Sequence, residues 1–176
     1  MADTYRGITH PFEPVWDGRS RVLVLGTFPS VLSRENAFYY GHPQNRFWPV
    51  LAAVFREAVP VTAAEKRALL LRHGVALWDV LASCDLTGSA DSSIRNPVPN
   101  DIAALLEKAP IRRVFANGQT AHALYRRWCE PAAGMRAVLL PSTSPANAAW
   151  TLPRLTEAWR ALLETPEAAA SEAPEP

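Results

Sequence analysis

The order of apolar and polar positions along the chain predicts short strands alternating with helices. Four segments are short and almost continuously apolar, which is typical of strands covered on both faces of a parallel sheet. These segments are RVLVLG at 21–26, VALWDV at 75–80, IRRVFANG at 111–118 and MRAVLL at 135–140. Segments with apolar residues at helical spacing separate them. We therefore predict an α/β fold, a three-layer αβα sandwich with a four-stranded parallel central sheet.

Capping signals mark where several helices begin and end. Asn45 stands at or near the N-cap of a helix that has Pro49 in its first turn, where the missing N–H donor is tolerated. Thr62 and Glu65 have capping-box spacing, and Gly74 suits the C-terminal cap of the same helix. Three further helices are expected in 100–110, 119–130 and 155–164.

Three segments show neither the apolar runs of the predicted strands nor the helical spacing of the predicted helices. The stretch 1–20 is rich in proline, glycine and aromatic residues, and we expect an extended arm packed on the core. The segment 81–101 is predicted to be a long polar loop, a length that is uncommon unless the loop is functional. The acidic segment 165–176 is predicted to be a disordered tail. The range 21–164 is predicted to be one domain, which suits a chain of 176 residues.

The composition excludes several classes of protein. No apolar run approaches the roughly 20 residues that a membrane helix needs, and the N-terminus lacks the pattern of a signal peptide, so the cytoplasm is the expected compartment. The two cysteines, Cys84 and Cys129, are far apart and the four histidines are scattered. We therefore expect no disulfide framework, no metal site and no iron–sulfur cluster.

The net charge of +1 neither supports nor excludes nucleic acid as a partner, because phosphate binding depends on where the charge lies. The acidic residues of 164–176 leave the rest of the chain with an excess of basic residues. All but two of the cations are arginine, which suits forked contacts with phosphate.

The loop after the first strand has an unusual composition. The sequence GTFPSVLSRENAFYYGHPQNRFW at 26–48 places aromatic residues, prolines, a histidine and an asparagine where small polar residues are expected. In parallel sheets, ligands bind beyond the carboxyl ends of the strands. Four segments meet there: this loop, WDV at 78–80, ANG at 116–118 and PSTSPANA at 141–148. We predict a site for a flat ligand at this edge.

These motifs, in this order, resemble the uracil-DNA glycosylase superfamily, most closely its hypoxanthine-DNA (deoxyinosine) glycosylase branch. The resemblance covers about residues 21–159 and rests on LVLGTFPS, YYGHPQNRFW, GVALWDV, ANG and LPSTSPANA. It implies an enzyme of base excision repair that uses no cofactor, and nothing in the sequence demands more than a monomer. Such an enzyme hydrolyses the N-glycosidic bond of a deaminated base in single-stranded or duplex DNA.

The catalytic residue implied by the resemblance is Asn45. In the superfamily, an Asn or Asp two residues after the glycine of the first motif usually orients the attacking water, but here Phe28 occupies that position. In the hypoxanthine branch, the asparagine of a stretch similar to HPxNxFW takes over, and this residue is Asn45. A role for Asn45 as a helix cap alone remains open.

The resemblance also assigns the base pocket. Tyr40 is implied as the platform on which the extruded base stacks, with Phe28 on the opposite side, because stacking lost in the duplex must be restored. Asp79 takes the position of an asparagine that reads the base in the uracil enzymes. A carboxylate only accepts hydrogen bonds, so it would bind the N1–H of hypoxanthine or N3–H of uracil and repel adenine. Asp79 as the cap of a turn is an open alternative.

The remaining implied contacts come from the first and last motifs. The full base-binding set is Gly26, Thr27, Phe28, Tyr40, Asp79 and Ser142, and the DNA-binding set is Ser30, His42, Ser144, Pro145, Ala146 and Asn147. Relatives often carry a large wedge where this chain has Ala146, so a weak grip on intact duplex is expected. The last motif also suits a turn closed by Ser and Thr side chains.

The same residues allow alternative functions. Strand cleavage through an amine needs a nucleophilic lysine, and Lys66 and Lys108 both fall in helices expected to face solvent. A hydrolase with Ser142 or Ser144 as nucleophile, helped by His42 and Asp79, lacks the G-x-S-x-G motif. A degenerate glycosylase that only binds nucleic acid or a nucleobase is the other alternative, suggested by Phe28.

Overall fold

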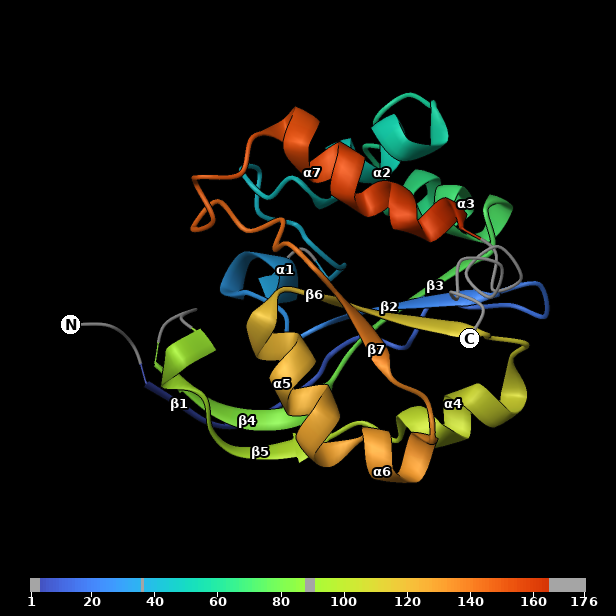
Figure 1. Ribbon diagram of the computed structural model, residues 1–176. Coiled ribbons are helices and arrows are strands. Elements are labelled where there is room, and N and C mark those ends of the chain that lie inside the picture. The colour runs from blue at the N-terminus through green and yellow to red at the C-terminus, as the bar shows by residue number, and fades with distance from the viewer. Residues whose placement is uncertain (1–3, 36, 88–90, 165–176) are drawn as a thin grey trace, which may run out of the picture.

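The computed structural model describes residues 4–35, 37–87 and 91–164 of the chain. Its centre is a four-stranded sheet in the order β3-β2-β6-β7, in which every pair of neighbours is parallel. The strands are β2 (Val22–Gly26), β3 (Val75–Asp79), β6 (Arg113–Asn117) and β7 (Ala137–Leu140). They fall in the four apolar segments, so the predicted parallel sheet is confirmed (Figure 1).

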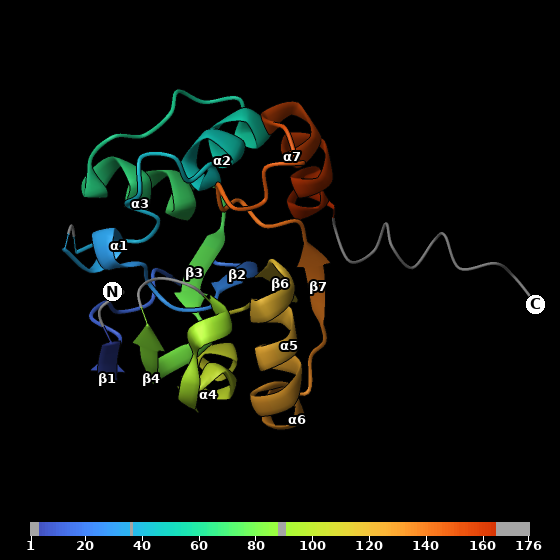
Figure 2. The same cartoon turned by 90° about the vertical axis from the view of Figure 1, so that its left-hand side faces the viewer.

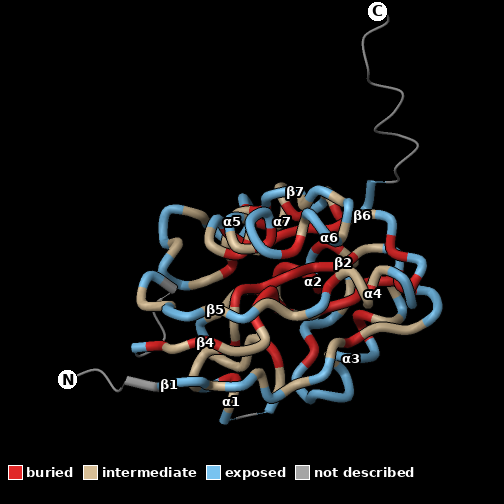
Figure 3. Tube along the Cα trace, turned by 90° about the horizontal axis from the view of Figure 1, so that it is seen from below, coloured by how far each residue is buried: buried red, intermediate tan, exposed pale blue. Residues whose placement is uncertain are grey.

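Helices cover both faces of this sheet (Figures 1 and 2). One face carries α2 (Phe47–Phe55), α3 (Ala63–Arg72) and α7 (Leu152–Trp159), and the other carries α4 (Ile102–Lys108), α5 (Gln119–Trp128) and α6 (Glu130–Ala133). Side chains alternate along a strand, so Val24 of β2 packs into one core while Leu23 and Leu25 pack into the other. All three are fully buried, and Figure 3 shows β2 buried through the middle of the molecule. The αβα sandwich is therefore confirmed.

The predicted helix ends are largely correct. Thr62 accepts a hydrogen bond from the backbone N–H of Glu65 in a full capping box at the start of α3. Gly74 follows the C-cap of that helix with a φ of +67°, a conformation that favours glycine. Helix α2 begins at Phe47, and Asn45 lies one residue before its N-cap, Arg46. A short helix, α1 (Val31–Glu35), and a final 3₁₀ turn, η2 (Arg160–Leu163), complete the chain order.

The long loop predicted over 81–101 is wrong for most of its length. It contains β4 (Leu81–Thr87), a 3₁₀ turn η1 (Asp91–Ser93) and β5 (Arg95–Pro99), which form an antiparallel sheet in the order β1-β4-β5 with β1 (Thr4–Thr9). Both pairings contain register shifts. These irregularities break the two-residue alternation, and the surrounding Gly, Ser, Asp and Pro conceal what remains of it. Residues 88–90 of the expected loop lie outside the described residues.

The segment before β2 lies along the outside of the sheet. After β1, Val15 forms an antiparallel bridge with Leu77 of β3, with both N–H to O=C distances at 2.9 Å. Val15 is buried, so this segment covers the outer edge of the parallel sheet. The acidic segment 165–176, expected to be disordered, lies outside the described residues.

Among the helices that the structure describes, none is both long and apolar enough to cross a membrane.

Candidate functional site

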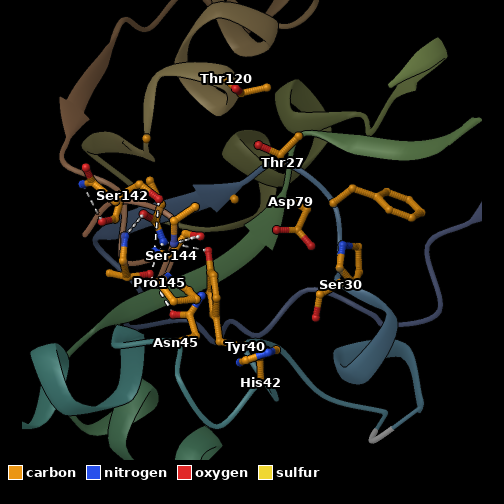
Figure 4. Close-up of a pocket in the computed structure, with 18 of the residues that line it drawn as sticks. Thr27, Ser30, Tyr40, His42, Asn45, Asp79, Thr120, Ser142, Ser144 and Pro145 are labelled. Carbon is orange, nitrogen blue, oxygen red and sulfur yellow. Dashed lines mark hydrogen bonds between the residues drawn. The ribbon is translucent and has the colours of Figure 1, made fainter. Parts of the chain in front are cut away.

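A cavity of about 910 Å³ lies at the carboxyl ends of the parallel strands. Every site residue expected from the sequence lines it, and Figure 4 shows how the central ones point toward one hollow. The lining residues in question are Gly26, Thr27, Phe28, Ser30, Tyr40, His42, Asn45, Asp79, Ser142, Ser144, Pro145, Ala146 and Asn147. The predicted convergence of the four strand-end segments is therefore observed.

Gly26 ends β2 and lines the cavity. A Cβ atom at this position would lie 2.3 Å from Oδ1 of Asp79 and 2.6 Å from the hydroxyl of Tyr40. Both distances are far inside van der Waals contact, so any larger residue would displace these groups. The glycine therefore allows a carboxylate and a phenol to meet over the strand end.

Tyr40 is held rigidly beside this point. Its ring stacks on Phe47 of α2, with ring centroids 4.0 Å apart and an interplanar angle of 17°. Its φ of +53° lies in the left-handed region, which is uncommon for a bulky residue and often marks a functional site. One face of the ring is therefore covered by the core, so a ligand in the cavity can reach only the other face.

The two aromatic residues before Tyr40 pack the loop onto the protein. Phe38 stacks with Trp48 at a centroid distance of 6.1 Å. Tyr39 is buried and its hydroxyl donates to the carbonyl oxygen of Glu13 at 2.9 Å. Burial raises the pKa of Tyr39 well above its ordinary value, and the nearby charge of Asp79 adds to the effect. Two of the three consecutive aromatic residues are thus structural supports for the third.

Asp79 is the only carboxylate among the described residues that line the cavity. It is 4% exposed, and its Oδ2 lies 2.8 Å from Nε2 of His10. Within the described ranges its carboxylate accepts no backbone N–H, so the turn-cap alternative does not match this geometry. His10 was missed as a site residue because nothing in the local sequence of the N-terminal arm links it to a position 69 residues away.

Asn45 uses its two ends differently. Its Oδ1 accepts hydrogen bonds from the backbone N–H of Phe47 and from the hydroxyl of Thr143, each at 2.9 Å. These two donors fix the orientation of the amide, because its oxygen must face them. The Nδ2 end makes no hydrogen bond to any described part of the chain, which leaves it available to a ligand. Asn45 can therefore support the start of α2 through its oxygen and face the cavity with its Nδ2 at the same time.

Asn117 connects these groups and was also missed. Its Nδ2 donates to the Tyr40 hydroxyl at 3.1 Å and to Oγ1 of Thr143 at 3.0 Å, while its Oδ1 accepts the Thr143 N–H at 3.1 Å. Both ends of the amide are thus used within the protein. The ANG motif marked this strand end, but only the long-range contacts reveal that Asn117 orders both neighbouring loops.

The loop after β7 is closed by its own side chains. Oγ of Ser142 accepts the N–H of Ser144 at 3.1 Å, and the amide of Asn147 donates to the Ser142 carbonyl oxygen at 3.0 Å. Arg46 fastens this loop from outside, because its guanidinium donates to the carbonyl oxygens of Ser144, Asn147 and Trp150. Pro145 and Ala146 are left exposed at the tip.

The remaining predicted residues also have local structural partners. Ser30 accepts the N–H of Ser33 at 3.2 Å and so caps α1, and Nδ1 of His42 accepts the N–H of Gln44 at 3.1 Å.

Neither lysine lines the cavity. Lys66 does not simply face solvent as expected, since its ammonium lies 5.4 Å from the centre of the Trp48 ring. Among the residues that the structure describes, no group of three His, Cys, Asp or Glu side chains could hold a metal ion.

Comparison with known proteins defines the class. The family model described as the uracil DNA glycosylase superfamily matches residues 14–163, so the fold and its cavity are those of a DNA glycosylase. The chain belongs to the uracil DNA glycosylase superfamily.

Individual relatives match over nearly their full length. The chain is 34% identical over 160 residues to a hypoxanthine DNA glycosylase of Methanosarcina acetivorans, covering 88% of this chain and 98% of that protein. It is 32% identical over 141 residues to a hypoxanthine DNA glycosylase of Methanosarcina barkeri, covering 77% and 86%. The solution structure of a candidate uracil DNA glycosylase from Methanosarcina acetivorans has a TM-score of 0.74 and 29% identity, covering 92% of this chain and all of that one.

Proposed function

We propose that this protein is a monofunctional DNA glycosylase that hydrolyses the N-glycosidic bond of deaminated bases, hypoxanthine first, in base excision repair. The observation that carries the proposal is the buried carboxylate of Asp79, which lies in one cavity with Tyr40 and Asn45. The names of the two Methanosarcina relatives support the choice of hypoxanthine. Every residue invoked comes from one chain, so we propose action as a monomer.

Base selection follows from the chemistry of the carboxylate. Hypoxanthine offers an N1–H donor, whereas adenine offers a lone pair at N1 and a donor amine. A carboxylate can only accept hydrogen bonds. Asp79 therefore binds the N1–H of hypoxanthine and repels the N1 lone pair of adenine. Uracil N3–H and xanthine N1–H satisfy the same acceptor. Guanine also carries N1–H, and its exclusion requires a wall against its 2-amino group.

The aromatic residues compensate the cost of extruding the base, which is on the order of a few kcal/mol. The base stacks on the face of Tyr40 that Phe47 does not cover, and Phe28 lines the other side. Because Phe47 already holds the Tyr40 ring, little side-chain freedom is lost when the base arrives.

Hydrolysis then uses water held by Asn45. Its free Nδ2–H donates to one lone pair of the water oxygen, and the other lone pair attacks C1′ of the sugar as the glycosidic bond breaks. The base leaves with the bonding electrons and is protonated, and the attacking water loses a proton to solvent. Since no lysine lines the cavity, water rather than an amine is the nucleophile.

The test uses labelled oligonucleotides with one deoxyinosine, single-stranded and duplex, incubated with protein and then treated with alkali. Release of hypoxanthine with strand breakage only after alkali supports a monofunctional hydrolase. Retention on a gel without product would instead identify a protein that binds and does not cut, the alternative suggested by Phe28.

Two variants separate the roles of Asn45. Asn45→Asp keeps oxygens for Phe47 and Thr143 but removes the N–H donor, so we expect single-turnover cleavage to fall by about 100-fold or more with little change in melting temperature. Asn45→Ala should lose the same activity and also about 1 kcal/mol of stability. Cleavage by Asn45→Ala near the wild-type rate would reduce Asn45 to a structural cap.

A further inference from the structure

His10 contacts the proposed base-reading group from outside the strand-end motifs. Its Nε2 lies 2.8 Å from Oδ2 of Asp79, and the two side chains are only 4% and 5% exposed. It belongs to the segment that follows β1, not to any of the four loops at the carboxyl ends of the parallel strands. The contact is therefore a feature of the tertiary structure, added to the cavity by the N-terminal segment.

The hydrogen bonds of the ring fix where its proton lies. Nδ1 of His10 accepts the backbone N–H of Phe12 at 3.2 Å. A ring nitrogen that accepts cannot carry a proton, so the neutral ring has its proton on Nε2 and donates it to Oδ2 of Asp79. The reverse arrangement, a protonated Asp79 donating to Nε2, would place an N–H at Nδ1 against the Phe12 N–H.

The ring is also held in place by its neighbours. It meets Phe12 and Phe28 edge to face, at centroid distances of 5.3 and 5.9 Å, and lies 5.8 Å from Tyr39. The backbone of His10 is tied to β4, since its N–H donates to the carbonyl oxygen of Ala82. With Oδ2 bound to this fixed donor, Oδ1 is the oxygen that remains over Gly26.

We propose that His10 is a positioning residue that keeps Asp79 as an acceptor aimed at the base, and that it thereby sets the preference for hypoxanthine over adenine. This inference rests on the function proposed above. A carboxylate without a fixed donor can turn, and its oxygens can then accept from the 6-amino group of adenine as well as from the N1–H of hypoxanthine. His10 holds Oδ2 and so keeps the carboxylate in one orientation, with Oδ1 toward the base.

The test measures binding as well as cleavage. Oligonucleotides carrying 2′-fluoro-deoxyinosine or 2′-fluoro-deoxyadenosine resist hydrolysis, because the fluorine destabilises positive charge on the sugar, and their Kd ratio reports base preference directly. We expect His10→Phe, which keeps an aromatic ring but has no donor, to lower the inosine preference by at least about tenfold. His10→Gln, whose amide N–H can reach Oδ2, should recover most of it. Phe12→Leu alters the same aromatic cluster without touching Asp79 and serves as the packing control.

A second variant keeps the test independent of whether the His10 variants fold. In Asp79→Asn, the Nε2–H of His10 must be met by the amide oxygen, so the NH₂ end faces the base. This variant should bind the adenine-containing oligonucleotide more tightly than the inosine-containing one. A preference for inosine retained by His10→Phe, or by Asp79→Asn where His10→Phe does not fold, would overturn the role of His10. Failure of the wild-type protein to release any base would instead overturn the proposed function, whatever His10 does.

Discussion

At the scale of single residues, the cavity depends on one position that lacks a side chain. Gly26 has no unusual backbone conformation, so its importance lies in space alone. Asp79 and Tyr40 come close enough to the strand end that both would be displaced by a methyl group. A glycine of this kind is invisible to propensity arguments, which treat it as the end of a strand.

Gly26→Ala should therefore damage activity more than stability. The methyl group must push Oδ1 of Asp79 and the Tyr40 hydroxyl away, and displacements of about 1 Å can cost about 100-fold in rate. Overpacking should cost about 1–3 kcal/mol of stability. Single-turnover release of hypoxanthine and thermal melting measure the two effects. Gly18→Ala is the control, since a Cβ atom there would have no neighbour within 4 Å, and equal activities of the two variants would contradict the argument.

At the scale of elements, the tip of the loop after β7 combines a rigid base with a small end. Arg46 and the internal hydrogen bonds hold the loop, while Pro145 and Ala146 are exposed. A wedge that replaces an extruded base in the duplex is normally a large apolar side chain. We expect the extruded state of intact duplex to be short-lived with alanine there.

Ala146→Leu should for this reason improve cleavage of duplex relative to single-stranded substrate, by about threefold or more. The measurement is the ratio of single-turnover rates on the two forms of the same deoxyinosine oligonucleotide. Ala148→Leu, an exposed position two residues further along the loop, should leave that ratio unchanged. An equal rise in both variants would indicate general apolar contact rather than a wedge.

The elements also show what sequence reasoning could reach. The parallel strands and their helices can be predicted from local periodicity and caps. Because ligands bind beyond the carboxyl ends of parallel strands, the motif residues could also be predicted to lie together at that edge of the sheet. The small antiparallel sheet was missed because β4 and β5 are interrupted by register shifts. His10, Asn117 and Arg46 were missed as site residues because their longest contacts span 69 to 104 residues of chain, which no local pattern encodes.

At the scale of the whole molecule, the N-terminal segment links the small sheet to the cavity. β1 pairs with β4, and His10 follows directly. Removing residues 1–9 should leave the parallel sheet folded and weaken the preference for inosine over adenine. The melting temperature should fall by about 2–4 °C for each kcal/mol of unfolding free energy that the deletion removes. Removal of residues 1–3, which precede β1, is the control. Unchanged preference in the longer deletion would show that His10 needs no support from β1.

The pairing of β1 with β4 has a consequence for the order of assembly. Thr4 lies opposite Thr87, so this ladder closes across most of the first half of the sequence. Contacts so distant along the chain form slowly, because the entropy of closing the intervening loop must be overcome first. During synthesis the first strand waits for its partner while the residues between them emerge. The β1–β4 ladder can therefore form only once residue 87 has emerged, and the purine preference proposed for His10 is acquired with it.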